Sequence, residues 1–267
     1  MLICVIKTGN IASSLVLDLL LDERADRKGI DVRVATSGAK MGPADCEDAA
    51  SRILGLGADL ILYSTPNPST PGPSKVIEML EGKRAVVIGD APGIKIKDKL
   101  EAAGLGYIFV KADSMIGARR EFLDPIEMVI FNGEMLKVLA VTGAFRVVQE
   151  EIDATIERED YLPRVIIDSD TAVSRSGIKN PYARAKALAA YEMAEKVGSM
   201  NVKGCFMQKE PEKYISTVTS AHELLRAAAA LADEAREIEK ANDAVLRRPH
   251  STDGRLLEKH GLFEKPS

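Results

Sequence analysis

The fold is decided by residues 2–23, which read LICVIKTGNIASSLVLDLLLDE. Residues 2–6 form a continuous apolar run, which is typical of a strand buried on both faces of a parallel sheet. A turn at Gly9 follows, and the apolar residues between Leu15 and Leu20 then recur on one face of a helix. This strand–turn–helix unit predicts the start of a parallel α/β sheet.

The same alternation continues as far as Lys111. Further strands are expected at 32–35, 59–63, 85–88 and 107–110, with helices at 45–56, 74–80 and 94–103 between them. Strands separated by helix-length segments indicate βαβ units, and therefore an α/β fold with an open parallel Rossmann-like sheet. We assign residues 1–121 to this domain, while the order of its strands stays open.

The pattern becomes mainly helical after Lys111. Residues 124–159 predict a long helix interrupted at Gly143, and 180–197 and 211–240 predict two more. The segments 164–167 and 202–208 resemble short strands of a small extra sheet. An Ala-rich stripe along the last helix requires a partner helix, so residues 122–267 are expected to form a C-terminal helical bundle that serves oligomerisation.

Composition excludes several classes of protein. The net charge is −4, the pI is about 5.6 and aromatic residues make up only 4%, so a nucleic-acid partner is not expected. The three cysteines have no paired spacing that would favour a disulfide framework or a zinc site. The sequence contains no apolar run of about 18 residues, so a membrane-spanning helix is not expected. The first residues also lack the features of a signal peptide, so we expect a cytoplasmic protein.

The loops that follow the strands are the expected ligand site, because open α/β sheets bind ligands at the carboxyl ends of their strands. The first loop holds Lys7, Gly9 and Asn10, with a single glycine that fits a plain tight turn equally well. The second loop has Ser37 and Lys40 where a site for NAD would carry an acidic residue. This counts against NAD and is compatible with a phosphate.

The third loop is stiffened by four prolines between residues 66 and 73. Its candidate ligand-binding residues are Thr65, Pro66, Asn67, Pro68, Ser74 and Lys75. A rigid connector is the alternative, but a connector needs neither this length nor this content of Ser, Thr and Asn. We therefore favour binding.

The last two loops combine carboxylates with cations. Asp90 follows the fourth strand, and the segment 111–125 after the fifth strand contains both cations and carboxylates. The alternative for this segment is a solvated, salt-bridged entry to a helix, which would have the same composition. His222 begins a pattern similar to a zinc protease motif, but Arg226 stands where the second histidine is required. No nucleophile elbow or P-loop is present either. Hydride transfer between two bound organic partners suits such a site, because it needs alignment and electrostatics more than an acid or a base.

These loops resemble the coenzyme F420-dependent methylenetetrahydromethanopterin dehydrogenases, and the resemblance covers nearly the whole chain. The segments that carry it are LLDERAD (20–26), PNP (66–68) with PGPSK (71–75), GDAPG (89–93), GARREFLDP (117–125), FRVVQE (145–150), SAHE (220–223) and NDAVLR (242–247). The resemblance implies reversible hydride transfer between 5,10-methylenetetrahydromethanopterin and coenzyme F420, which gives the methenyl product and reduced F420 in archaeal one-carbon metabolism and methanogenesis. It also implies no metal and a homohexamer built as a trimer of dimers.

Roles for individual residues follow as hypotheses. The methenyl product is a cation, so a nearby carboxylate should stabilise it; the candidates are Asp90, Asp113, Asp124 and Glu127. The candidates for binding the coenzyme are Lys7, Gly9, Asn10, Ser37, Lys40, Thr65, Pro66, Asn67, Pro68, Ser74 and Lys75. The candidates for binding the pterin substrate are Lys111, Met115, Arg119 and Arg120. Replacing Asp124 with Asn is expected to lower turnover.

Two other functions stay open on the residues alone. One is an NADP-linked dehydrogenase on the same sheet, which the missing glycine fingerprint weakens. The other is a non-catalytic α/β ligand-binding module assembled through its helices, which the Pro-rich and charged loops make less attractive.

Overall fold

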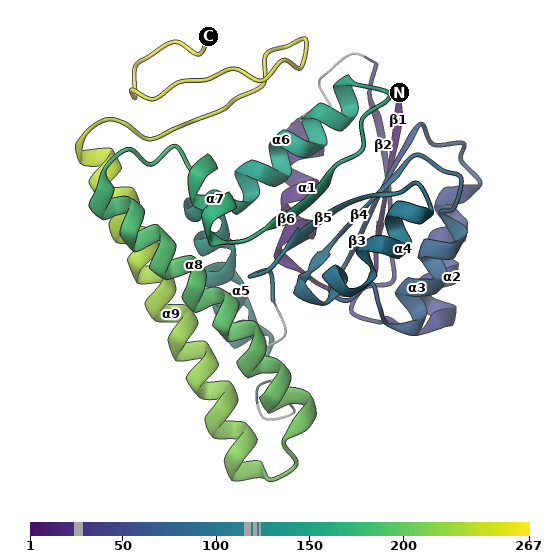
Figure 1. Cartoon of the computed structure of the whole chain (residues 1–267), viewed down its shortest axis with the longest axis horizontal. Coiled ribbons are helices and arrows are strands. Elements are labelled where there is room, and N and C mark those ends of the chain that lie inside the picture. Colours follow the sequence, from purple (N-terminus) through teal and green to yellow (C-terminus); the bar gives the residue numbers. More distant parts are fainter. Residues whose placement is uncertain (24–28, 115–118, 120–121, 123) are drawn as a thin grey trace. The chain divides into compact units, whose positions relative to one another are not determined.

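A computed structural model of the chain describes residues 1–23, 29–114, 119, 122 and 124–267, and its sheet has six strands in the order β2-β1-β3-β4-β5-β6 (Figure 1). The strands are β1 (Leu2–Lys7), β2 (Asp31–Thr36), β3 (Leu60–Thr65), β4 (Ala85–Asp90), β5 (Gly106–Val110) and β6 (Arg164–Ile167). The register pairs β1 with β2 and β3, β3 with β4, and β4 with β5, all in parallel. The predicted open parallel sheet is therefore confirmed.

Helices follow the strands as the periodicity predicts. They are α1 (Ala12–Glu23), α2 (Pro43–Leu54), α3 (Pro71–Met79), the 3₁₀ turn η2 (Ala91–Ile96) and α4 (Lys97–Ala102). Both α2 and α3 have a proline in their first turn, where the missing N–H removes no helical hydrogen bond.

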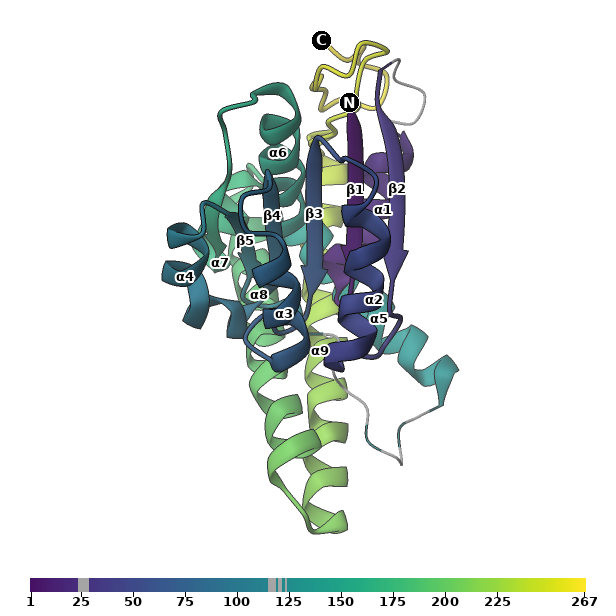
Figure 2. The same ribbon diagram turned by 90° about the vertical axis from the view of Figure 1, so that its right-hand side faces the viewer.

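Alternating side chains of the strands build the core of this α/β part. One face of the sheet packs against α2, α3 and α4, with Tyr63 of β3 and Phe109 of β5 among its fully buried side chains. Helix α1 covers the opposite face, as the two views in Figures 1 and 2 agree. Every residue of β3 and β4 is buried, as expected for central parallel strands, whereas most of the edge strand β2 is exposed.

The strand order places a switch point between β1 and β3. From β1 the chain crosses to β2 on one side, and from β2 it returns past β1 to β3 on the other side. The connections that leave β1 and β3 therefore diverge, and this divergence is where open α/β sheets form a binding crevice.

The chain divides into two compact units. The first comprises residues 1–110, 148–166 and 249–257, and the second comprises 111–147, 167–248 and 258–267. The remaining helices are α5 (Pro125–Thr142), α6 (Ala144–Glu157), α7 (Ser169–Arg175), α8 (Pro181–Val202), the π-helical turn η4 (Lys203–Met207) and α9 (Pro211–Ala241). In the second unit α8 and α9 pack along their length through buried alanines, which confirms the expected helical bundle.

One predicted strand is wrong. Residues 202–208 end α8 and form the π-helical turn η4, because a short apolar run does not by itself distinguish a strand from a helix. Gly204 allows this turn to approach α9, since a Cβ there would lie 2.7 Å from Val218 Cγ2. The other predicted strand, at 164–167, is β6 at the edge of the main sheet, so the described residues contain a single sheet.

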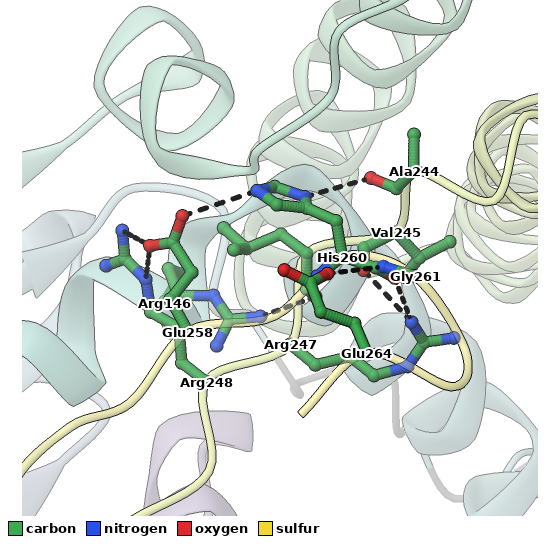
Figure 3. Close-up of polar contacts among 10 residues, drawn as sticks. Arg146, Ala244, Val245, Arg247, Arg248, Glu258, His260, Gly261 and Glu264 are labelled. Carbon is green, nitrogen blue, oxygen red and sulfur yellow. Dashed lines mark hydrogen bonds and ion pairs between the residues drawn. The ribbon is translucent and has the colours of Figure 1, made fainter. Parts of the chain in front are cut away.

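Polar contacts hold the end of the chain to the segment after α9 (Figure 3). Arg247 donates through Nη1 to the His260 carbonyl at 2.5 Å, and its backbone pairs with Lys259. Glu264 Oε2 accepts the N–H groups of His260 at 2.6 Å and Gly261 at 2.8 Å. The C-terminal segment is therefore fixed within the second unit by specific partners.

No single helix in the described parts of the chain has both the length and the apolar character needed to cross a membrane, although α5 and α6, bent by 70°, pass that test as a pair.

The junction of α5 and α6 depends on Gly143, which has a φ of +97°. A Cβ at this position would lie 2.2 Å from the Ala172 carbonyl oxygen. We predict that Gly143→Ala lowers the free energy of unfolding by at least about 2 kcal/mol, because both the backbone conformation and the contact become unfavourable. Denaturant unfolding followed by circular dichroism measures this change.

Gly133→Ala is the matched control. Gly133 lies in the middle of α5, and a Cβ added there would meet no other described residue within 4 Å. Alanine should therefore be neutral or should stabilise the helix by up to about 1 kcal/mol. Equal stability of the two variants would contradict the argument.

Candidate functional site

The first three loops of the sheet meet around Gly9. Its N–H donates to the Gly38 carbonyl at 2.9 Å, and its φ of +74° is one that L residues rarely adopt. A Cβ on Gly9 would lie 2.7 Å from Met41 Sδ and 2.9 Å from Pro66 Cδ. The loops after β1, β2 and β3 are thus packed against one another at the switch point, and two of the candidate residues, Gly9 and Pro66, lie side by side there.

Internal hydrogen bonds shape the Pro-rich third loop. Asn67 Oδ1 accepts the Ser69 N–H at 3.1 Å, and Thr70 Oγ1 donates to the Asn67 carbonyl at 2.8 Å. Ser74 Oγ reaches back to the Pro68 carbonyl at 3.2 Å. The side chains of Asn67 and Ser74 therefore hydrogen-bond within the loop and fix the conformation of its backbone.

The predicted cations of this unit fall into two groups. Lys7 bonds to Asp18 and, at 2.9 Å, to the Ser14 carbonyl, so its ammonium is directed to α1. Lys40 and Lys75 are exposed, on the second loop and in the first turns of α3. Lys40 and Lys75 are therefore better placed than Lys7 to meet an anion from solution.

Small polar groups complete the loop ends. Asn10 is exposed, whereas Ser37 donates through Oγ to the Lys40 carbonyl at 2.6 Å and so closes the second loop on itself. At the end of β3, the Ser64 Oγ and Thr65 Oγ1 atoms are buried and have no hydrogen-bond partner among the described residues. Buried hydroxyls without a hydrogen-bond partner are uncommon in folded proteins, which makes the end of β3 unusual.

Asp90 is the carboxylate of the first unit that lies at this edge of the sheet. It ends β4, is only 8% exposed, and its Oδ1 accepts the Ala91 N–H at 2.6 Å. The neighbouring Gly89 lies close to the third loop, since a Cβ there would be 3.1 Å from the Thr65 carbonyl oxygen. Asp90 therefore lies beside the end of β3, where the Pro-rich loop begins.

The start of the fifth loop is anchored on α8 in the second unit. Lys111 Nζ lies 3.0 Å from Glu195 Oε1, and this hydrogen bond raises the pKa of Lys111 above its usual range. Asp113, two residues further on, is fully buried. Tyr191 of α8 has a hydroxyl whose pKa is raised by burial, and this hydroxyl donates to the Ile167 carbonyl of β6 at 2.5 Å. Lys111 would have to leave Glu195 to bind an anionic substrate.

Arg119 also has partners within the second unit. Its Nη1 donates to the Cys205 carbonyl at 2.6 Å, and its guanidinium lies 4.0 Å above the ring centre of Tyr214. Met115 and Arg120, the other two candidates on this loop, lie outside the described residues.

Asp124 and Glu127 lie at the exposed start of α5. Asp124 is the N-cap, and its Oδ1 accepts the Ile126 N–H at 2.8 Å, while Glu127 lies in the first turn. A capping role accounts for Asp124 without any ligand.

Two buried residues beneath the loops were not among the predicted site residues. Thr8 and Tyr63 share a hydrogen bond of 2.8 Å although 55 residues separate them. Thr8 lies in the first loop, between the candidates Lys7 and Gly9. Tyr63 lies in an apolar run that predicts only a buried strand, and its hydrogen-bond partner depends on the strand order, which the sequence leaves open. Among the described residues, no group of three His, Cys, Asp or Glu side chains is arranged to hold a metal ion.

Known proteins resemble the chain over its full length. The family model for methylene-5,6,7,8-tetrahydromethanopterin dehydrogenase matches residues 1–267. F420-dependent methylenetetrahydromethanopterin dehydrogenases from Methanothermobacter thermautotrophicus and Archaeoglobus fulgidus are 57% and 52% identical, with 98% of this chain and 98% and 97% of theirs covered. A solved structure of such an enzyme in complex with methylene-tetrahydromethanopterin and coenzyme F420 superposes with a TM-score of 0.95 and 50% identity, covering 100% of this chain and 99% of that one.

The capping role of Asp124 yields a prediction. Asp124→Ala should lower the free energy of unfolding by about 1 kcal/mol, because the Ile126 N–H loses its acceptor. Asp124→Asn should change it by no more than a few tenths, because Asn caps as well as Asp. Denaturant titration compares the two, and an equal loss in both would show that the charge, and not the cap, carries the contribution.

Proposed function

The chain belongs to the methylene-5,6,7,8-tetrahydromethanopterin dehydrogenase family, and we propose that it transfers a hydride reversibly between 5,10-methylenetetrahydromethanopterin and coenzyme F420. The products are the methenyl form of the pterin and reduced F420. The observation that carries this proposal is the likeness, over 100% of the chain, to an enzyme solved with both of these partners bound.

The loops at the switch point suit the coenzyme. Gly9 and Pro66 give them a fixed shape, and the exposed Asn10 offers a polar contact beside them. The exposed Lys40 and Lys75 supply positive charge for the phosphate and carboxylates of its tail. When bound there, the deazaflavin supplies the chemistry by accepting or returning the hydride.

The residues of the chain contribute alignment and electrostatics to this reaction. Rigid loops reduce the entropy lost on binding and hold the two reacting partners in one orientation. A carboxylate close to the reacting carbon stabilises the positive charge that develops there. Of the four candidates Asp90 has the strongest support, because it is buried at the sheet edge beside the Pro-rich loop, whereas Asp124 and Glu127 are exposed. Asp113 is also fully buried, in the second unit.

The assembly is part of the same proposal, as a homohexamer built from three dimers in the cytoplasm. Exposed apolar side chains support a protein partner: on α5, Ile126, Val129 and Ile130 are 68%, 66% and 54% exposed at a spacing that shares one helix face. Phe206 and Met207 in η4 are similarly exposed.

A direct assay tests the reaction. Purified protein, oxidised F420 and methylenetetrahydromethanopterin are mixed, and the visible absorbance of the deazaflavin is followed. We expect bleaching that requires both organic partners and that NADP cannot replace. Reduction of NADP alone would favour the NADP-linked alternative, and failure to bind any coenzyme at saturating concentration would favour a non-catalytic module.

The role of Asp90 is tested by Asp90→Asn. We expect kcat to fall about 100-fold, because a preorganised charge near the developing cation is lost, while the Kd for F420 changes less than about threefold. Asp98→Asn is the matched control, since Asp98 carries the same charge in the exposed first turn of α4. An unchanged kcat in the Asp90 variant would remove this residue, and Asp124→Asn, which keeps its cap, would then test the next candidate.

A further inference from the structure

A group of buried hydroxyls lies directly beneath the loops that meet at Gly9. Thr8 and Tyr63 are both 0% exposed, and their oxygen atoms lie 2.8 Å apart in a hydrogen bond. Thr8 immediately precedes Gly9, and Tyr63 is three residues before Pro66 along β3 and its exit. One hydrogen bond thus connects the starts of the two loops that diverge at the switch point.

Two more polar side chains border this bond. Burial raises the pKa of the Tyr63 phenol, and the nearby Thr65 hydroxyl lowers it by a smaller amount. Thr65 Oγ1 nevertheless has no hydrogen-bond partner of good geometry in the described part of the chain. The Thr8 hydroxyl also interacts with the buried Cys46 thiol of α2 and lowers its pKa, again against the larger effect of burial. The Tyr63–Thr8 hydrogen bond therefore belongs to a small polar group formed by the exit of β1, by β3 and by α2.

Packing extends this link to the second and third loops. Gly72 at the start of α3 allows close approach of the second loop, since a Cβ there would lie 2.2 Å from the Met41 carbonyl oxygen and 2.9 Å from Cys46 Sγ. Met41 in turn fills the space beside Gly9. A shift of Thr8 would therefore be transmitted to all three loops.

Stability alone gives no reason for this polar group. The surrounding cluster is apolar, and burying a hydroxyl contributes little unless its hydrogen bond is well made. A phenyl ring in place of the Tyr63 phenol would pack against the same neighbours without the need for a partner. Buried polar pairs instead select one arrangement of the groups that they join.

We infer that Tyr63 is a positioning residue for the coenzyme: its hydrogen bond to Thr8 fixes the spacing of the loops after β1 and β3, between which F420 binds. This inference rests on the proposed function. Tyr63 is buried beneath the loops and acts on the ligand only through them.

The test compares F420 binding with turnover in Tyr63→Phe. We expect the Kd for F420, measured by fluorescence titration, to rise about tenfold, because binding must then order loops that the hydrogen bond no longer holds. At saturating F420 the kcat should stay within about twofold of wild type, since the bound geometry is restored. A general loss of structure would raise the Kd and lower kcat together, and so would not produce this split.

Tyr107→Phe is the matched control. Tyr107 is 5% exposed near the start of β5, and its hydroxyl donates to Glu101 Oε1 at 2.9 Å, at the other end of the strands from the loops. The Kd for F420 should not change in this variant. Thr8→Val should reproduce the effect of Tyr63→Phe, and Thr8→Ser, which keeps the hydroxyl, should restore tight binding.

The outcomes separate the two claims. Unchanged F420 affinity in folded Tyr63→Phe and Thr8→Val would overturn the inference and leave the proposed function intact. A wild-type protein that binds no F420 would overturn the proposed function, and the positioning role with it.

Discussion

Gly9 has no side chain, and its surroundings leave no room for one. A Cβ would lie within 3.0 Å of both Met41 and Pro66, and the backbone adopts a φ of +74°. The loops after β1, β2 and β3 pack closely around this glycine. Since β1 and β3 are the strands at which the chain changes direction across the sheet, the shape of this edge of the sheet depends on how closely these loops approach.

Apolar burial stabilises the strands at this edge of the sheet, and hydrogen bonds stabilise the loops. The central strands β3 and β4 are buried throughout, which fixes the strands but does not specify the loops. The loops are specified by directional contacts: the Asn67 turn, the Ser37 closure and the pair formed by Thr8 and Tyr63. Such contacts add little net stability each, but they select one loop arrangement, and preorganisation of this kind favours ligand binding.

Short-range patterns in the sequence predict the parts of the structure that depend on neighbours along the chain. Apolar runs located the strands, and Gly143 marked the break between α5 and α6. Contacts between distant residues were not predictable, because the strand order was open: Tyr63 bonds Thr8 across 55 residues, and Lys111 meets Glu195 on α8. The run at 202–208 was assigned to a strand because its length and composition suit either structure, and packing of Gly204 against α9 decides for a π-helical turn.

Hydrogen–deuterium exchange with and without F420 tests most directly whether these three loops bind the coenzyme. The account predicts that saturating F420 slows exchange in peptides covering residues 9–14, 37–42 and 65–72, with smaller changes at the opposite ends of the strands. Protection confined to other parts of the chain, under conditions in which fluorescence shows F420 to be bound, would contradict it.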